Sequence, residues 1–248
     1  RYAALSYTVG PEPELRYPEL ADQSGLNPDD ATPTHRYVAT RLVGSTRGAG
    51  GVRLRFATDD PAGRRILVRG GPGPAGTLAL RVTVTRPGEV RAVAAAFRSD
   101  RREAFHGLGG RRESTDLRGR AVQNWVLDYR YPDATTGYYA PLPSLVSGRG
   151  YGVLLDSDRI ARWRLGSDDP AAWRVSVAGA ALRLTVAPGP ARRAMGALSA
   201  ITGRHRVAPA WSMGPMLSRT VGVLGDREPG AYRAKVQADV DRLVSSKA

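Results

Sequence analysis

The sequence has 248 residues, with 37 basic and 23 acidic side chains, three histidines and no cysteine. That length is enough for one large domain or two modest ones with hydrophobic cores. The lack of cysteine excludes disulfide frameworks, thiolate metal sites, iron–sulfur clusters and a thiol nucleophile. The histidines are isolated from one another, and no run approaches the roughly 18 apolar residues of a membrane helix. We therefore expect no metal site, no cofactor and no membrane partner.

The formal net charge of +14 raises the question of nucleic-acid binding. Only two of the 37 basic residues are lysine, Lys235 and Lys247, and arginine accompanies heavy use of alanine and glycine. That bias is more typical of a GC-rich genome than of a binding surface. The arginines are dispersed, with no run longer than pairs such as Arg64–Arg65, and aromatic residues do not interleave with them. We therefore predict no nucleic-acid partner.

Residues 1–34 are rich in proline, acids and small residues, and we expect them to form an irregular lead-in that can lie across a sheet. Residues 35–189 are predicted to form an antiparallel β-sandwich. Apolar residues alternate with polar or small ones over 52–56, 78–84 and 182–186, which is the period of a half-buried strand. Short apolar runs at 66–68 and 153–155 and glycine–proline clusters complete a pattern of many short strands without helices.

After residue 189 the spacing of the apolar residues changes from the two-residue period of strands to the three- and four-residue spacing of a helix. Ala194, Leu198 and Ile201 are spaced by four and three, and Gly203 follows as a stop signal, so a helical linker is predicted over 190–208. Residues 209–248 are predicted to contain a buried strand at 211–217, a loop and an amphipathic helix near 232–243. Strand, loop and helix in this order form the first unit of an α/β repeat. One such unit cannot bury its faces alone, so we expect the sequence to be cut shortly after a second domain begins.

Several short motifs then occur in one order. They are Glu103–Gly110, Asp116–Gly119, Asn124–Asp128, Tyr138–Ser144, Gly150–Ser157, Ile201–Arg204, Pro209–Gly214 and Ser218–Arg219. No single piece is specific, but together they cover roughly residues 100–245, and in this order and spacing they resemble the N-terminal region of glycoside hydrolase family 31. The first 100 residues contribute only compatible strands.

This resemblance implies a mainly β fold, a galactose-mutarotase-like antiparallel β-sandwich followed by the first strand–helix unit of an incomplete (β/α)8 barrel. It also implies retaining hydrolysis of an α-glycoside or oligosaccharide substrate. Retention needs two carboxyl groups about 5–5.5 Å apart, and the family carries both as aspartates on later barrel strands. A barrel takes roughly 250 residues, so both are expected beyond Ala248. We therefore assign no catalytic residue here and expect this chain alone to be inactive.

Three residues are candidates for substrate binding. Asp128 resembles the aspartate that a sandwich loop of the family inserts into the −1 subsite, where a carboxylate accepts hydrogen bonds from sugar hydroxyls; the alternative is an ordinary loop aspartate beside Arg130. Trp125 could present its ring to a sugar or pack in the core. Arg219 follows the predicted barrel strand, and could bind the sugar or pair with a neighbouring aspartate.

Other residues leave both a functional and a structural interpretation open. His106 could line the site, although a lone histidine is more often structural. The glycines at 107, 109 and 110 lack the context of a phosphate-binding loop and favour tight turns with close backbone approach. Arg118 could bind an acidic sugar or serve the fold. A freestanding carbohydrate-binding sandwich is the alternative to a glycosidase fragment, and the substrate, oligomeric state and export remain open.

Overall fold

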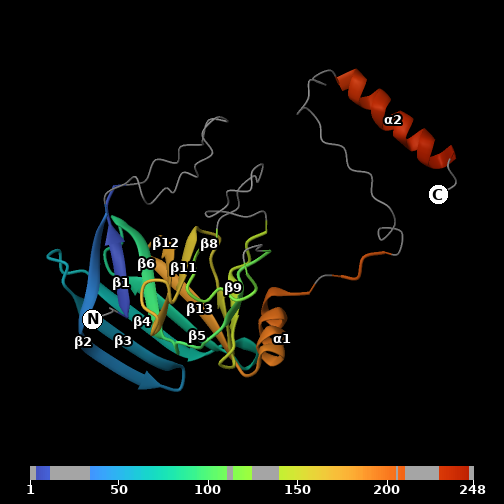
Figure 1. Ribbon diagram of the computed structural model, residues 1–248. Helices are drawn as coiled ribbons and strands as arrows, with labels where there is room; N and C mark the ends of the chain where they lie inside the picture. The colour runs from blue at the N-terminus through green and yellow to red at the C-terminus, as the bar shows by residue number, and fades with distance from the viewer. Residues whose placement is uncertain are drawn as a thin grey trace. The chain divides into compact units, whose positions relative to one another are not determined.

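The computed structural model describes residues 4–11, 34–110, 114–124, 140–204, 206–209 and 229–245. The chain divides into two compact units, Arg1–Arg204 and His205–Ala248 (Figure 1). In chain order, the strands of the described residues are β1 (Leu5–Val9), β2 (His35–Gly48), β3 (Gly51–Thr58), β4 (Arg65–Pro72), β5 (Leu78–Val84), β6 (Val90–Arg98), β7 (Phe105–Gly107), β8 (Ala121–Asn124), β9 (Ser144–Ser147), β10 (Tyr151–Leu155), β11 (Ala161–Leu165), β12 (Ala172–Ala178) and β13 (Ala181–Pro188). The helices are η1, a 3-10 turn at Pro74–Gly76, α1 (Ala191–Thr202) and α2 (Pro229–Ser245).

The predicted antiparallel sandwich is confirmed. Every strand pairing among the described residues is antiparallel, and the spatial order is β7-β9-β10-β13-β5-β4-β3-β2-β1-β6-β12-β11-β8. The apolar residues that predicted the strands correspond to buried positions. In β5, for example, Val82 and Val84 are buried whereas Arg81 is exposed. In strands of this kind one face forms the core and the other faces outward, whereas β10 is buried on both faces because α1 covers its outer side.

Strand β2 joins two sheets. Its first residues pair with β1, whereas Ala39 to Gly48 pair with β3. The register of the second pairing shifts between Ala39 and Arg41 and between Leu42 and Gly44, and such bulges bend a strand and increase its twist. We call β1, β6, β12, β11 and β8 sheet A, and β3, β4, β5, β13, β10, β9 and β7 sheet B (Figure 1). Strands β5 and β13 of sheet B lie against β6 and β12 of sheet A, so the two sheets form the layers of the sandwich.

The core between the sheets is centred on aromatic side chains. Trp173 of β12 stacks on Phe97 and on Trp163, with ring centroids 4.4 and 6.1 Å away. Phe105 of β7 meets the ring of Trp173 edge-on at 6.4 Å, which ties sheet B to sheet A. Phe105 and Trp163 are fully buried, and each such side chain contributes about 1.5–3 kcal/mol to folding.

Helix α1 packs on the outer face of sheet B. Its buried residues Ala194 and Leu198 contact Leu154 and Ala187 of the sheet, and a Cβ at Gly152 would lie 3.1 Å from Leu198. Glycine at position 152 therefore permits the close approach of helix and strand. The structure has the predicted helix and its end at Gly203 (φ +88°), and α1 falls within the first compact unit, which runs to Arg204.

The lead-in contains a strand that the sequence did not reveal. Residues 5–9, within the stretch predicted to be irregular, form β1, which pairs with β2 on one side and β6 on the other. Tyr7 and Ser6 are buried there, and Tyr7 donates a hydrogen bond to Oδ2 of the buried Asp60 at 2.8 Å. The prediction of irregular structure is wrong at these five residues because a segment this short is stabilised by its neighbours, not by local preference.

The second unit is described only in part. The predicted C-terminal helix is present as α2, which carries Val236, Val240 and Val244 as exposed residues on one helical face. The strand predicted at 211–217 lies outside the described residues. Among those that are described, no helix combines the length and the apolar character needed to cross a membrane.

Candidate functional site

The three predicted substrate-binding residues, Asp128, Trp125 and Arg219, lie outside the described residues. The structure nevertheless describes both ends of the segment that contains Trp125 and Asp128. Strand β8 ends at Asn124 before this segment, and the chain continues at Ala140 towards β9. Residues 125–139 lie outside the described residues, and we name them the edge loop after the sandwich loop that the family resemblance implies for Asp128 and because they follow β8, the last strand at one end of the sheet order.

Hydrogen bonds hold the two ends of the edge loop close together. The side-chain amide of Asn124 donates to the carbonyl oxygen of Leu142 at 2.7 Å. The amide of Gly110 donates to the carbonyl of Ala140 at 3.3 Å, and that of Leu108 to Ser144 at 2.8 Å. The base of the edge loop is thus tied to β8 of sheet A and to the turn after β7 of sheet B.

The turn after β7 requires glycine because its backbone lies directly against the backbone near Ala140. Gly107, Leu108 and Gly109 all have positive φ angles, of 117°, 61° and 101°. A Cβ at Gly109 would lie 2.2 Å from the carbonyl oxygen of Ala140, a distance that no side chain can adopt. The interpretation of these glycines as a tight turn is confirmed, and the turn presses directly on the base of the edge loop.

A buried carboxylate lies behind this turn. Glu103 is 3% exposed, and its Oε1 accepts hydrogen bonds from the hydroxyls of Ser147 at 2.6 Å and Tyr151 at 2.5 Å. Its Oε2 accepts from the hydroxyl of Ser99 at 2.8 Å and from the amide of Asp100 at 3.2 Å. Burial alone would raise the pKa of Glu103, but these hydrogen bonds outweigh burial and hold the pKa below its ordinary value.

The same cluster shifts the pKa of Tyr151 in the opposite direction from that of Glu103. Burial and the neighbouring Glu103 carboxylate raise the pKa of Tyr151, so its hydroxyl stays protonated and remains a donor. The cluster of Glu103, Ser99, Ser147 and Tyr151 links the segment before β7 to β9 and β10. Because each oxygen of the carboxylate already has two donors, Glu103 ties these segments together, and β9 is the strand that follows the edge loop in the chain.

His106, Asp116 and Arg118 also serve the fold. Nδ1 of His106 lies 2.6 Å from the carbonyl oxygen of Thr115, so this ring nitrogen carries the proton and donates. Asp116 accepts hydrogen bonds from the amides of Phe105 and Arg118 at 3.0 and 2.9 Å.

The guanidinium of Arg118 donates to Ser99 at 2.7 Å and to the carbonyl of Pro170, and it lies over the ring of Phe105. This arrangement supports the structural interpretation of His106 and Arg118. Arg111 and Arg112 lie outside the described residues.

The described part of the site is therefore a rigid support for a loop. Among the described residues, no group of three or more histidines and carboxylates is arranged to hold a metal ion. In the sequence, Glu103 and Asn124 stand out only as members of motifs, and their roles were not predicted. Ser99 and Asp100 lie within four residues of Glu103, but its partners Ser147 and Tyr151 and the partner of Asn124 are 18 to 48 residues away, so no local signal could reveal the clusters.

Comparison with known proteins identifies the family of the sandwich domain. Residues 22–158, more than half of the chain, match the model of the glycosyl hydrolase 31 N-terminal galactose mutarotase-like domain. The α-xylosidase XylQ of Lactiplantibacillus pentosus is 29% identical over 120 residues, which are 47% of this chain and 15% of that protein.

Two solved structures show the same fold at low identity. The cycloalternan-forming enzyme from Listeria monocytogenes, in complex with a pentasaccharide substrate, has a TM-score of 0.58 and 15% identity over 71% of this chain and 23% of its own. A GH31 family sulfoquinovosidase from E. rectale, in complex with an aza-sugar inhibitor, has a TM-score of 0.55 and 14% identity over 84% of this chain and 32% of its own. The chain thus spans 15% of the curated relative and about a quarter to a third of these structures. With its galactose-mutarotase-like sandwich and the matched domain, this chain belongs to glycoside hydrolase family 31.

Proposed function

We propose that this chain is the N-terminal part of a retaining α-glycosidase and that its edge loop supplies one wall of the −1 subsite. The observation that carries the proposal is the base of that loop. Asn124 and the turn after β7 hold both ends of residues 125–139 at one edge of a family 31 sandwich. Fixing both ends of a segment in advance reduces the conformational entropy that the segment loses on binding.

Asp128 is the residue that we propose contacts the sugar. An ionised carboxylate can accept hydrogen bonds from two vicinal hydroxyls, and these bonds strengthen as the ring distorts towards the transition state. Trp125 would lie at the start of the loop as a packing or ring-stacking residue. Arg219 would bind a sugar hydroxyl or hold the mouth of the barrel through a neighbouring aspartate.

In this proposal the nucleophile and the acid/base belong to barrel strands beyond Ala248. The buried carboxylates of the described sandwich do not suit either role. Asp60 receives hydrogen bonds from Tyr7, Arg64 and the amide of Ala62, and Glu103 receives four. A nucleophile needs a free oxygen facing the substrate, whereas these oxygens are already occupied by donors.

The test uses the whole protein encoded by the gene and the Asp128→Asn variant. Hydrolysis of aryl α-glucosides, α-xylosides and α-galactosides identifies the substrate, and kcat/KM is then compared between variants. We expect Asp128→Asn to lower kcat/KM at least a hundredfold, because charge-assisted hydrogen bonds to the transition state are lost. The matched control is Asp158→Asn, which removes an exposed carboxylate just after β10 and should change kcat/KM less than twofold.

Two results would contradict the proposal. If Asp128→Asn hydrolyses the best substrate as fast as Asp158→Asn does, the edge loop does not form part of the subsite. If the gene ends at Ala248 and the chain binds sugars without hydrolysing them, the freestanding carbohydrate-binding module replaces the glycosidase.

A further inference from the structure

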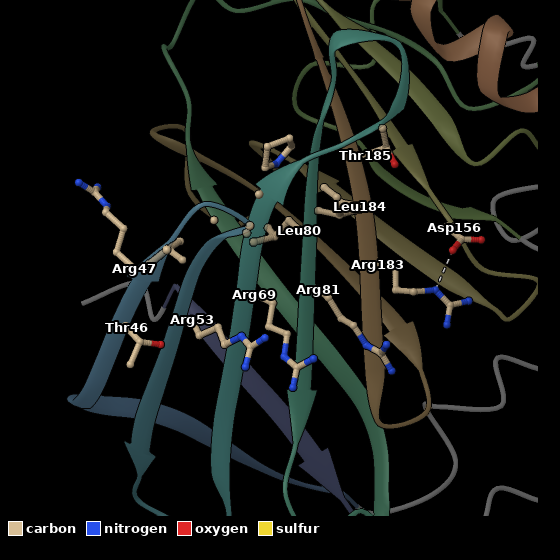
Figure 2. Close-up of a pocket in the computed structure, with 18 residues that line it drawn as sticks. Thr46, Arg47, Arg53, Arg69, Leu80, Arg81, Asp156, Arg183, Leu184 and Thr185 are labelled. Carbon is tan, nitrogen blue, oxygen red and sulfur yellow. Dashed lines mark hydrogen bonds and ion pairs between the residues drawn. The ribbon is translucent and has the colours of Figure 1, made fainter.

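Four arginines from neighbouring strands lie side by side on the outer face of sheet B. In the register of the sheet, Arg69 of β4 is directly opposite Arg53 of β3 and Arg81 of β5. Arg81 is in turn opposite Arg183 of β13. Figure 2 shows the four side chains in a row across the sheet. Because adjacent strands are about 4.8 Å apart, this arginine row is roughly 14 Å long.

The arginine row has an excess of positive charge. Nε of Arg183 donates to Oδ2 of Asp156 at 2.7 Å, at one end of the row (Figure 2). Among the described residues, no carboxylate forms an ion pair with Arg53, Arg69 or Arg81. Like charges directly opposite one another destabilise a sheet. Three adjacent cations that no carboxylate of the described sandwich neutralises are therefore suited to an external anion.

The arginine row lines a groove of about 570 Å³ on this face. Two residues along the strands from the arginines, Gly71, Ala79 and Thr185 form a parallel row of small side chains. A Cβ at Gly71 would lie 2.4 Å from the carbonyl oxygen of Gly50, so the turn between β2 and β3 lies close over β4 there. The small residues leave a hollow beside the guanidinium groups, and its volume is in the range of ligand sites.

The chemistry of the lining residues selects the kind of anion. A guanidinium presents a planar set of donors that matches a carboxylate or a phosphate in a bidentate geometry, so the contacts within the row decide between them. The contact between Arg183 and Asp156 shows that the row accepts a carboxylate at one end. None of the described residues that line the groove is aromatic, so it lacks the stacking surface that single-stranded nucleic acids require.

We propose that the arginine row binds a carboxylate-bearing oligosaccharide, such as a short chain of uronic acid residues, along this groove. The choice of a carbohydrate rests on the proposed function, whereas the choice of a carboxylate rests on the row itself. The groove is formed by β3, β4, β5 and β13, whereas the edge loop is anchored at β7 and β8. The strands that form the groove are therefore different from the strands that anchor the edge loop.

The test measures binding of oligogalacturonate to the 248-residue chain by isothermal titration calorimetry at two salt concentrations. A neutral maltooligosaccharide, a sulfated oligosaccharide and a DNA oligomer serve as comparison probes. The variant Arg69→Gln/Arg81→Gln removes the two central charges of the row. The matched control Arg98→Gln/Arg120→Gln removes the same charge from exposed positions in β6 and before β8.

We expect Arg69→Gln/Arg81→Gln to weaken oligogalacturonate binding at least tenfold and the control to weaken it less than twofold. The affinity should fall as salt increases, because exposed charges are screened. The melting temperature of Arg69→Gln/Arg81→Gln should be unchanged or higher, since the substitution relieves repulsion in the sheet. That measurement separates loss of binding from loss of folding.

Four results would overturn the inference. They are no binding of oligogalacturonate, equal losses in the two double variants, equal binding of the neutral sugar, and equal or tighter binding of the sulfated sugar or DNA. The proposed function is tested independently. In the whole enzyme, Arg69→Gln/Arg81→Gln should leave hydrolysis of a small neutral aryl α-glycoside unchanged, so failure of the groove and failure of the subsite give different results.

Discussion

The substitution Glu103→Gln tests whether the buried carboxylate holds the edge of the sandwich together. In the folded chain the two carboxylate oxygens accept four hydrogen bonds, two each. Glutamine keeps the shape of the side chain but replaces one oxygen by an amide nitrogen that donates. Two of the surrounding donors then lose their acceptor in a buried place, at about 1–3 kcal/mol each. We expect a loss of about 3 kcal/mol, which corresponds to a melting temperature lower by roughly 6–12 °C for a chain of this size.

The pH dependence of stability gives a second readout of the same carboxylate. The pKa of Glu103 is lower in the folded than in the unfolded chain, because its hydrogen bonds outweigh the effect of burial. Its contribution to stability is therefore fully present above the ordinary glutamate pKa of about 4.3 and is lost as the pH falls through the folded pKa. Between about pH 5 and pH 3, the native chain should lose more stability than Glu103→Gln does.

Thermal unfolding followed by circular dichroism at pH 7 measures the first effect, and the same scans in acid measure the second. The matched control is Glu89→Gln, because the Glu89 side chain is 68% exposed and pairs with Arg64 at 2.6 Å. In Glu89→Gln the guanidinium of Arg64, which is 11% exposed, keeps its ion pair with Asp60, so only the contact with the exposed Glu89 carboxylate is lost, at about 1 kcal/mol. If Glu103→Gln and Glu89→Gln melt within 2 °C of each other, the reasoning about the buried cluster is wrong.

Three further predictions follow from the packing of the sandwich and from the proposed function. Gly152→Val should destabilise the chain by about 1–3 kcal/mol in chemical denaturation, because the added atoms meet Leu198 and Ala194 of α1; Gly196→Ala on the same helix, where a Cβ meets nothing within 4 Å, is the control. Asn124→Ala should destabilise the chain by about 1 kcal/mol and speed amide exchange around Leu142; unchanged exchange there would refute the proposed anchoring of the edge loop. The 248-residue chain should not hydrolyse aryl α-glycosides in a chromogenic assay, and turnover above a buffer blank would show that catalytic residues lie within it.

Local patterns in the sequence predicted most of the sandwich. Residues 78–84 and 182–186 alternate because one face of each strand is buried, and a short window is enough to detect that period. The helix ending at Gly203 was predicted for the same reason. Strand β1 was missed because five residues carry too little periodic signal, and its formation depends on pairing with β2 and β6 far along the chain.

The sequence by itself determined the class of fold, the family resemblance and the place of Asp128 within the motif Asn124–Asp128. Only the tertiary structure decided that Glu103 is an acceptor for four donors and that Asn124 closes the base of the edge loop. It also brought together arginines that are dispersed in the sequence, because antiparallel register aligns Arg53, Arg69, Arg81 and Arg183 on one face. The physical reason is that local periodicity reports which face of a strand is buried, whereas partners across strands are set by register and sheet order, which no short stretch of sequence contains.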